Sequence, residues 1–398
     1  MNKIFKKILL FFQILLIISC LSQTTIRGEE TGKISIAEVH AEYVEAEPPL
    51  PTEDYLTIIA VGDNLYHNVM IRDGEEGDYI SAYTEIKQLV QEADIAFINQ
   101  ETMLGGEDFG FTGYPQFNSP QALGRAIAEI GFNVVNHANN HVMDKGEKAV
   151  IATMDLWDTM PQVAVLGIHR DEESRNKPVL LTINNITVGF LGYTFGTNGL
   201  PVPRGKPWMV SLIDTKIMAG EIDAIRPLCD FLVVSMHWGD EYDHNYNKRQ
   251  KDLAELFAKH DVDLIIGHHP HVIQKVEFVP KPQGGEMLCY YSLGNFLSAQ
   301  SEAPRWLGAM AYVKLKKSRN ETGEPDEIAP VNIVIEEYGA LPLVTHFEKG
   351  HTGFKVYPLY DYTSDLAKKH WKDGVTLDYF QKLSLSIFQE KMLSANPF

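Results

Sequence analysis

The chain has 398 residues, of which 44% are hydrophobic and 22% are charged, and its formal net charge is −18 at pH 7. This acidity argues against nucleic acid or an anionic bilayer as the main partner. It is compatible with an anionic substrate, because a bound metal ion can dominate the local field. About 345 residues follow the N-terminal region, so we expect one embellished domain.

The first residues have the pattern of a bacterial lipoprotein signal. Three lysines within the first seven residues precede an apolar run, Ile8–Ile18, which is shorter than the roughly 20 residues that a membrane-spanning helix needs. We therefore predict a signal peptide over residues 1–19 and lipidation of Cys20. The alternative is that Cys20 lies by chance beside another cleavage site or in an uncleaved anchor. In either case we expect the body to lie outside the cytoplasm, and with Cys20 lipidated it would be anchored to the bacterial membrane.

Residues 20–54 contain many acids, scattered prolines and little apolar periodicity. Such a segment cannot bury enough apolar surface to order itself. We predict an acidic, disordered tether between the membrane anchor and the folded body.

Two further cysteines, Cys229 and Cys289, lie in or beside apolar runs. Small buried side chains are the simplest interpretation of both. A disulfide between them is an alternative in an oxidising compartment, but three cysteines form no framework that could support the fold.

From residue 55 onward, short β-rich runs alternate with helical patterns. Strand, helix and strand repeated in this way predict parallel pairing with helices on the faces of the sheet. The expected strands are 55–61, 95–99, 133–136 and 163–166, and the expected helices between them are 82–92, 120–130 and 148–157.

The middle of the chain begins with a predicted hairpin, because two β-rich runs are joined by Asn184-Asn185. A second alternating stretch follows, with a strand at 231–236, a helix at 248–260 and a strand at 263–267. Both features are compatible with a mixed α/β architecture.

The later β-rich runs have no helix between them: 275–278, 287–293, 309–316 and 330–335. We therefore expect an antiparallel meander at the end of a domain that spans 55–348, with mixed sheets packed in a sandwich. Residues 349–398 have a helical pattern, and we predict a helical extension there. Its last helix has an apolar stripe of Leu377, Phe380, Leu383 and Phe388.

Polar side chains of the kind that bind metal ions follow several of the predicted strands. Loops at the carboxyl ends of strands are where α/β proteins gather their chemistry. Carboxylate, imidazole and carboxamide groups are ligands for hard or borderline divalent metals. The clusters are Gly62-Asp63, Asn99-Gln100-Glu101, Asn136 through His141, His237 through Glu241, Gly267 through His271 and Gly294-Asn295.

Asp63 emerges as the first strand ends, and Gly62 would let the backbone turn tightly there. A single Gly-Asp pair is common in turns. However, Glu101 repeats the arrangement after the next strand. Two carboxylates at neighbouring strand ends can hold two cations, as two-metal hydrolases require.

The cluster after the third strand combines a carboxamide with a histidine. Asn140 offers an oxygen to a hard metal, and His141 lies three residues before Asp144. A histidine held by a carboxylate can act as an acid. His137 is more simply explained as a residue satisfied by hydrogen bonds in the loop.

The remaining histidines follow the strands of the second alternating stretch. His237 ends one apolar run, and His269 and His271 follow another. Alternation in an extended strand end would direct the imidazoles of His269 and His271 to the same side, whereas His268 would face away and be structural. Neutral imidazoles are good ligands for Zn, Mn or Fe.

In order and spacing, these motifs resemble the bacterial poly-γ-glutamate capsule-biosynthesis (CapA) family, within the calcineurin-like metallophosphoesterase superfamily. The resemblance covers roughly residues 55–300. It implies an α/β fold, specifically a four-layer α/β/β/α sandwich with a dinuclear metal centre at the sheet edge. Carried over by position, it implies that the metal ligands are Asp63, Glu101, Asn140, His237, His269 and His271.

The resemblance also implies that His141 is the acid of the Asn-His pair, beside Asp144. The chain departs from the superfamily pattern at Leu65, where a histidine is usual, and His67 is the candidate replacement. Glu101 stands where ordinary phosphoesterases have a bridging aspartate. These departures leave the number of bound metals open.

We therefore predict a membrane-anchored protein with a phosphoesterase-type site that holds divalent metal ions, two of them by resemblance, chosen from Mn, Fe and Zn. It would act in the synthesis, transfer or release of an anionic capsule polymer such as poly-γ-glutamate. One alternative is a non-catalytic subunit that binds polymer or a partner; another is a general envelope phosphodiesterase. The expected partners are an anionic polymer or phosphoester substrate, the membrane and other capsule-synthesis membrane proteins, without nucleic acid.

Overall fold

The computed structural model describes residues 53–74, 78–319 and 331–398. The predicted signal peptide, the lipidated Cys20 and nearly all of the predicted tether lie outside these residues. The tether prediction extends two residues too far, because the first strand begins at Glu53. Within the described ranges, no helix combines the length and apolar character needed to cross a bilayer.

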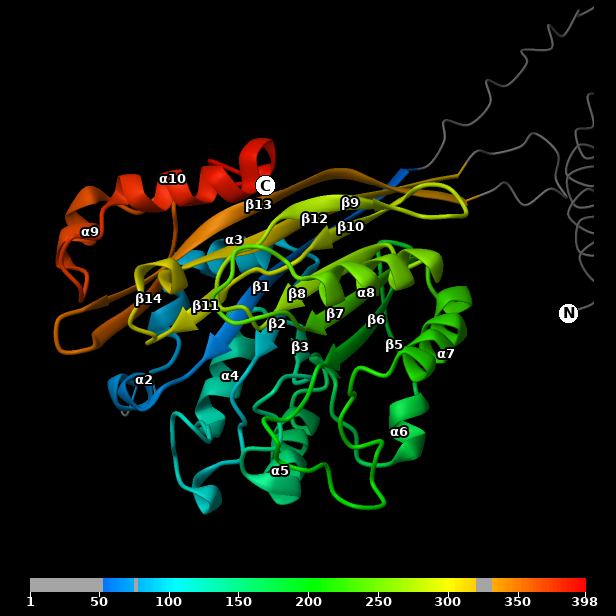
Figure 1. Cartoon of the computed structure of the whole chain (residues 1–398), viewed down its shortest axis with the longest axis horizontal. Coiled ribbons are helices and arrows are strands. Elements are labelled where there is room, and N and C mark those ends of the chain that lie inside the picture. Colours follow the sequence, from blue (N-terminus) through cyan, green and yellow to red (C-terminus); the bar gives the residue numbers. More distant parts are fainter. Residues whose placement is uncertain (1–52, 75–77, 320–330) are drawn as a thin grey trace, which may run out of the picture. The chain divides into compact units, whose positions relative to one another are not determined.

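Two β-sheets pack against each other (Figure 1). In the described residues the first sheet contains β1 (Glu53–Leu65), β2 (Ile95–Gln100), β3 (Val134–Asn136), β4 (Ala164–Leu166), β11 (Asn295–Ser298), β12 (Leu307–Arg319), β13 (Val331–Glu348) and β14 (Thr352–Pro358). Their order is β14-β13-β12-β1-β2-β3-β4, with β11 beside β1. The strands from β1 to β4 pair in parallel, as the alternating pattern predicts, whereas β12 to β14 add antiparallel strands.

The second sheet comprises β5 (Val179–Ile183), β6 (Ile186–Thr194), β7 (Phe231–His237), β8 (Leu264–His268), β9 (Val276–Pro280) and β10 (Glu286–Tyr290). Its order is β5-β6-β7-β8-β10-β9. The hairpin of β5 and β6 is confirmed. Asn184 and Asn185 have φ of 49° and 59°, the left-handed conformation that a two-residue hairpin turn requires.

The predicted antiparallel meander after residue 275 is only partly correct. β12, β13 and β14 form one, but β9 and β10 extend the second sheet, and β10 is parallel to β8. The chain then crosses to the first sheet through β11, which pairs in parallel with β1. The absence of a helix between two strands does not specify which sheet each strand joins, and this is why the prediction failed.

Helices cover the sheets on their outer faces. The longer helices are α4 (Gln121–Ile130), α5 (Gly146–Asp158), α7 (Thr215–Ile225), α8 (Lys248–Lys259) and α10 (Leu377–Phe388), and the shorter ones are α2 (Asn68–Asp73), α3 (Lys87–Glu92), α6 (Glu172–Asn176) and α9 (Ser364–Lys369). The helix predicted over 82–92 is a 3₁₀ segment, η1 (Ser81–Ile86), followed by α3. The sequence pattern did not predict α2, α6 or α7.

The alternation of side chains along β7 shows how the layers form. Phe231 and Val233 belong to the core between the sheets, while Leu232 and Val234 pack with α7 and α8. Successive strand residues point to opposite faces, so the second sheet is buried on both. The buried side of α4 packs in the cluster that contains β2 and β3. The predicted four-layer α/β/β/α arrangement is confirmed.

The C-terminal segment from 349 onward belongs to the same compact unit as the sheets. It begins with β14, so it is helical only from Ser364 onward. The predicted terminal helix is α10, which lies along β13 (Figure 1). Phe380 and Phe388 of its apolar stripe are buried, as expected.

The cysteines within the described residues are both free thiols. Cys289 is fully buried in the core between the second sheet and its helices, and Cys229 is half-buried. The alternative of a disulfide between them is therefore not realised.

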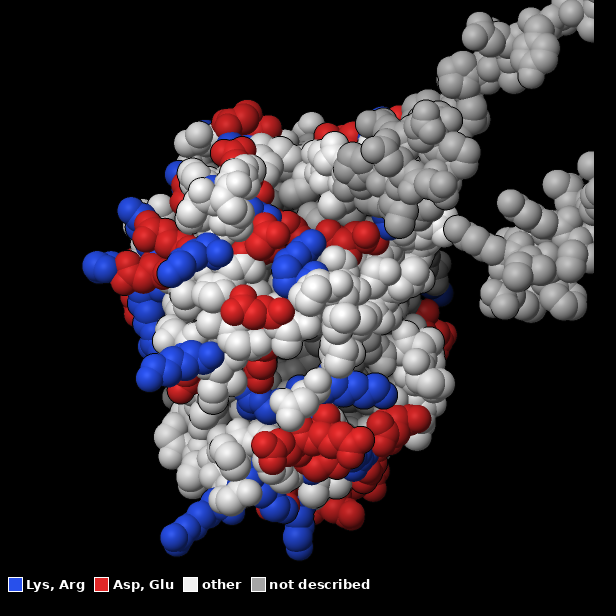
Figure 2. Space-filling model, turned by 90° about the vertical axis from the view of Figure 1, so that its right-hand side faces the viewer, with Lys and Arg blue, Asp and Glu red and all other residues white. Residues whose placement is uncertain are grey.

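Acidic and basic side chains lie side by side on the face that Figure 2 shows, and no continuous basic surface is visible there.

Phe380→Ala should destabilise the protein by about 3–5 kcal/mol, because it leaves a cavity where α10 meets β13. Urea unfolding would measure the change. Leu385→Ala on the same helix is the matched control, because Leu385 is 55% exposed and should change stability by no more than about 0.5 kcal/mol. Equal effects of the two substitutions would contradict the packing of this extension.

Candidate metal centre

Asp63 reaches the centre because β1 passes very close to the turn before β11. A β-carbon on Gly62 would lie 1.9 Å from the carbonyl oxygen of Gly294, so only glycine permits this contact. The N–H of Asp63 donates to the same oxygen at 2.9 Å. Gly62 therefore serves close packing inside β1, not the tight turn at a strand end that the sequence suggests.

The carboxylate of Asp63 is buried and held on both oxygens. Oδ1 accepts a hydrogen bond from Nδ2 of Asn99 at 2.8 Å, and Oδ2 accepts one from the N–H of His269 at 3.2 Å. Nδ1 of His271 lies 3.0 Å from Oδ2. Burial raises the pKa of Asp63, but the hydrogen bonds and the neighbouring imidazoles outweigh it, so its pKa lies below the ordinary value. A negative charge is thus maintained here.

Glu101 follows β2 directly and is completely buried, yet neither carboxylate oxygen has a hydrogen-bond partner among the residues that the structure describes. Oε1 lies 3.6 Å from Nε2 of His237 and 3.7 Å from Nε2 of His271. Burial and the charge of Asp63 hold the pKa of Glu101 well above its usual range. A buried carboxylate without a partner is costly unless a cation compensates it. Its surroundings therefore fit a metal ion.

Five of the six predicted ligands form two overlapping groups. Ligand atoms of Asp63, Glu101 and His237 lie within 4.8 Å of one another, and so do those of Glu101, His269 and His271. All five side chains are buried. Mixed oxygen and imidazole donors at this spacing suit Zn, Mn or Fe. Glu101 belongs to both groups.

Asn140 completes the predicted set. Its Oδ1 lies 2.9 Å from Nε2 of His237, and its Nδ2 donates to Oδ1 of Asn198 at 3.2 Å. Asn140 comes from the loop after β3, whereas His237 ends β7 in the other sheet. The contact between them therefore closes the centre across the two sheets.

The turn after β8 carries two ligands in a strained conformation. His269 and His271 have φ of 97° and 58°, so the expected extended strand end is wrong, although the imidazoles do reach the same centre. Such positive values cost about 1–3 kcal/mol for residues other than glycine and cluster at functional sites. Burial and then the neighbouring His271 lower the pKa of His269 to about 3, which keeps its imidazole neutral and able to bind a metal.

His141 and Asp144 form a buried pair beside the ligand groups. Nδ1 of His141 lies 2.8 Å from Oδ2 of Asp144, which also accepts the N–H of Phe117 at 2.7 Å. The ring of Phe117 packs edge-to-face with the imidazole, and the two ring centroids are 4.6 Å apart. Nε2 of His141 has no hydrogen-bond partner within the described residues and is reached by solvent. The pair can therefore exchange a proton at Nε2.

The candidate replacement ligand, His67, belongs to neither ligand group. Its Nδ1 lies 3.1 Å from the oxygen of Leu65 and 3.3 Å from the N–H nitrogen of Ala299. The main chain therefore engages this nitrogen, and the structure does not bring His67 into contact with the predicted ligands.

His137 is held by a hydrogen bond, as the sequence suggests, whereas His268 does not face away from the predicted ligands, because its Nδ1 lies 3.6 Å from Oδ1 of Asp63. Nε1 of Trp157 donates to Nε2 of His137 at 2.8 Å. The ring of His268 is fully buried and stacks on Phe97 at 5.8 Å between centroids. Neither is needed as a ligand to complete the two groups.

Several residues around the centre have no role assigned from the sequence. Oδ1 of Asn295 lies 3.0 Å from Nδ1 of His271 and orients that imidazole. Asn99 orients the carboxylate of Asp63 in the same way. Both asparagines belong to the motifs named in the sequence, and this membership could have indicated their supporting role. Phe195, with its ring 4.5 Å from that of His269, follows β6 without any such signal.

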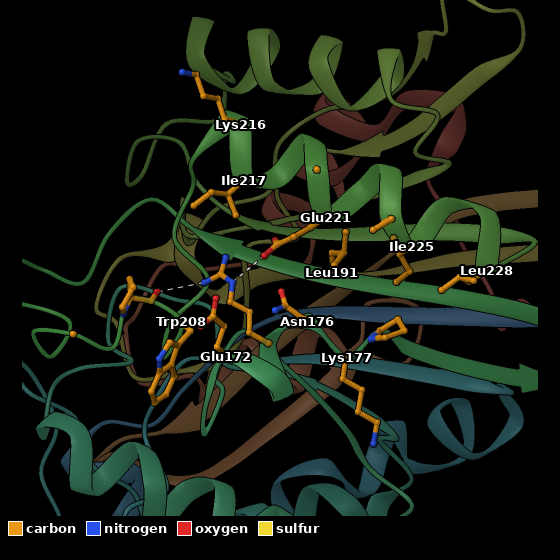
Figure 3. A pocket seen from close by; sticks show the side chains of 16 residues that line it. Glu172, Asn176, Lys177, Leu191, Trp208, Lys216, Ile217, Glu221, Ile225 and Leu228 are labelled. Carbon is orange, nitrogen blue, oxygen red and sulfur yellow. Dashed lines mark hydrogen bonds and ion pairs between the residues drawn. The ribbon is translucent and has the colours of Figure 1, made fainter.

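A separate pocket of about 770 Å³ lies between α6, α7 and β6 (Figure 3). Nε of Arg175 lies 2.9 Å from Oε1 of Glu221, whose other oxygen accepts a hydrogen bond from Tyr193 at 2.6 Å. The pocket contains none of the predicted ligands, and its half-buried arginine is already neutralised by Glu221.

A family described as "Bacterial capsule synthesis protein PGA_cap" matches residues 57–300. The chain is 30% identical to "PGA biosynthesis protein CapA" of Bacillus subtilis (strain 168) over 210 residues, which is 52% of this chain and 53% of that protein. It is also 30% identical to "Capsule biosynthesis protein CapA" of Bacillus anthracis over 229 residues, 56% of this chain and 53% of that protein. The match thus spans about half the length of each relative.

Two solved structures share part of the chain arrangement. The NAD nucleotidase NadN of Haemophilus influenzae is 10% identical with a TM-score of 0.43, and the alignment covers 86% of this chain and 64% of that one. A putative 5'-nucleotidase from Staphylococcus aureus, solved in complex with alpha-ketoglutarate, is 14% identical with a TM-score of 0.39, and the alignment covers 83% and 58% of the two chains.

Glu101→Gln should abolish the stabilisation of this protein by divalent metal ions. A divalent ion at 100 times its dissociation constant should stabilise the wild type by about 2.7 kcal/mol, measured with Mn²⁺ or Zn²⁺ in thermal unfolding. In chelator the variant should be at least as stable as the wild type, because it lacks the uncompensated buried carboxylate. Glu241→Gln, at an exposed neighbouring carboxylate, should retain the response. A full response in Glu101→Gln would contradict the assignment.

The metal-free protein should lose stability as the pH falls below 6.5. Burial lowers the pKa of His137 from 6.5 to about 3, so between these values the unfolded chain binds a proton that the folded chain does not. Stability present above pH 6.5 is therefore lost toward pH 3, by about 1.4 kcal/mol per pH unit for this histidine. His137→Gln can still accept the hydrogen bond from Trp157. Its free energy of unfolding, measured in urea between pH 4.5 and 6.5, should change with pH less steeply than that of the wild type, by that amount. Equal slopes would contradict it.

Proposed function

This chain belongs to the bacterial capsule synthesis protein family PGA_cap, and from that membership we propose that it is a metal-dependent hydrolase or transferase of the metallophosphoesterase type. Its substrate in this proposal is an anionic polymer of the cell envelope, such as poly-γ-glutamate. The reaction serves the synthesis, transfer or release of that polymer.

One observation carries the proposal: a buried carboxylate shared by two ligand groups lies close to a histidine held by its own carboxylate. Glu101 belongs to both groups, so its carboxylate would be available to both ions if two were bound. Asn198 connects the two halves, because its side chain contacts Asn140 at 3.2 Å and Nδ1 of His141 at 3.4 Å. A site for binding alone would not need the His141–Asp144 pair.

When bound, divalent ions would supply Lewis-acid activation of the bond to be cleaved and a water of lowered pKa. The residues that would hold them are Asp63, Glu101, Asn140, His237, His269 and His271. Asn99 and Asn295 orient two of these ligands from behind. The protein thus offers a preformed set of donors.

His141 acts as the general acid. In the imidazolium form of His141, Nδ1–H donates to Asp144, whose negative charge stabilises the ring. Nε2 then carries the second proton and passes it to the leaving atom as its bond to the reacting centre breaks, which leaves a neutral imidazole with its hydrogen on Nδ1. Phe117 covers the imidazole edge and fixes Asp144 through its main-chain N–H. The pair is therefore held in one orientation before substrate arrives.

The location and partners form part of the same proposal. The predicted signal peptide and Cys20 support a lipid-anchored protein outside the cytoplasm, where an envelope polymer is accessible. Other capsule-synthesis membrane proteins are the proposed partners, because the names of the Bacillus relatives refer to capsule or PGA biosynthesis.

His141→Asn and Asp144→Asn should each lower turnover about 10²- to 10⁴-fold while metal content and folding are retained. Hydrolysis of an aryl phosphodiester and shortening of poly-γ-glutamate would be measured on the same metal-loaded samples. His260→Asn is the matched control, because His260 pairs with Asp223 at the same 2.8 Å but at the surface. Metal binding without turnover in the wild type would instead favour a polymer-binding subunit.

A further inference from the structure

Arg305 lies beside the metal centre, just beyond the segment that matches the family. It belongs to the 3₁₀ helix η4 (Ala303–Trp306) and is half-buried. Its guanidinium carbon lies 3.5 Å from the centre of the Tyr242 ring. The centroid of that ring is 6.1 Å from the centroid of His271. One aromatic side chain therefore separates the guanidinium from a ligand imidazole.

The guanidinium of Arg305 has no anionic partner in the described part of the chain. It makes neither a hydrogen bond nor an ion pair with any residue in the ranges that the structure describes, although the chain has a net charge of −18. The nearby carboxylate of Glu302 is paired with Lys372 at 3.1 Å. Arg175 in the pocket of Figure 3 differs, because Glu221 neutralises it. Arg305 thus retains five donors for a ligand.

A single buried side chain fixes the main chain of Arg305 relative to the metal ligands. Nδ2 of Asn295 donates to the carbonyl oxygen of Arg305 at 2.9 Å, and Oδ1 of Asn295 lies 3.0 Å from Nδ1 of His271. The separation between the arginine and the ligand is therefore set by one rigid amide.

Tyr242 is tied to the same ligand turn. Its N–H donates at 2.8 Å to the oxygen of Pro270, which lies between the two ligand histidines. Its φ of 68° is a left-handed value that costs about 1–3 kcal/mol outside glycine. The side chain is 42% exposed, so this conformation holds the ring at the solvent side of the centre, where it supports the guanidinium.

The C-terminal extension braces the loop from behind. The ring of Trp306 lies 4.2 Å from that of His370 and 6.1 Å from that of Trp371, measured between centroids. Together with the ion pair of Glu302 and Lys372, these contacts hold η4 against the segment after β14. The loop that carries Arg305 is thus fixed on both sides.

From these contacts we infer that Arg305, stacked on Tyr242, forms an oxyanion-binding subsite for the ligand at the metal centre. The subsite takes a carboxylate or phosphate group of the polymer, next to the bond that reacts, through the forked donors of the guanidinium. This inference rests on the proposed function, because it assigns an anionic substrate to the same centre. Arg305 determines specificity and takes no part in proton transfer.

The test is calorimetric binding to the metal-loaded full chain. The probes are inorganic phosphate, a γ-linked triglutamate and the same peptide with its α-carboxyl groups converted to amides. Arg305→Gln should weaken at least one anionic probe about 10- to 100-fold and leave the amide peptide unchanged. Arg305→Lys should restore only part of the affinity, because lysine lacks the planar fork. Arg249→Gln removes an exposed arginine on α8 and should have no effect.

Selective weakening of the triglutamate would identify a carboxylate as the bound group, and selective weakening of phosphate would identify a phosphate. Anionic probes that bind Arg305→Gln within twofold of the wild type would overturn the inference, as would equal weakening of the amide peptide or no binding to the wild type. Turnover of the aryl phosphodiester is measured on the same samples. Unchanged turnover in His141→Asn would count against the proposed function alone, because the binding result does not depend on it.

Discussion

The meeting of two sheets at one buried group of charges is the constraint on which the structure depends. The first sheet contributes carboxylates, Asp63 and Glu101, and the second contributes imidazoles such as His237. Two buried carboxylates without a compensating cation would oppose this packing. The arrangement is therefore compatible with a divalent metal ion held between the layers, and the N–H of His269 on Asp63 links the two sheets directly.

In the proposed function, the chemical tasks around this centre are separated. His141 and Asp144, on the loop after β3, would handle the proton. Arg305 and Tyr242, on loops of other strands, provide the unpaired positive charge. Each group is positioned by hydrogen bonds or stacking to residues that do not react, as precise catalysis requires. Because the chain is acidic overall, an unpaired guanidinium at this place is stronger evidence for an anionic ligand than it would be on a basic protein.

Five of the six ligands predicted from the motifs lie in two compact groups, but the sequence explained parts of their local geometry incorrectly. His269 and His271 meet the same partners, yet they do so from a left-handed turn and not from an extended strand. Gly62 is required by the oxygen of Gly294, a residue far away in the sequence. The meander prediction failed for a similar reason, because β10 pairs with β8 and not with the strands that follow it.

The sequence by itself determined the alternating α/β order, the residues available as ligands and the terminal apolar helix, because periodicity and residue chemistry are local properties. Only the tertiary structure decided which sheet each late strand joins, and how Asn295 connects His271 to Arg305. It also decided that Glu101 lacks a partner while Glu302 has one. These outcomes depend on distances between residues remote in the chain, and local pattern carries no information about such distances.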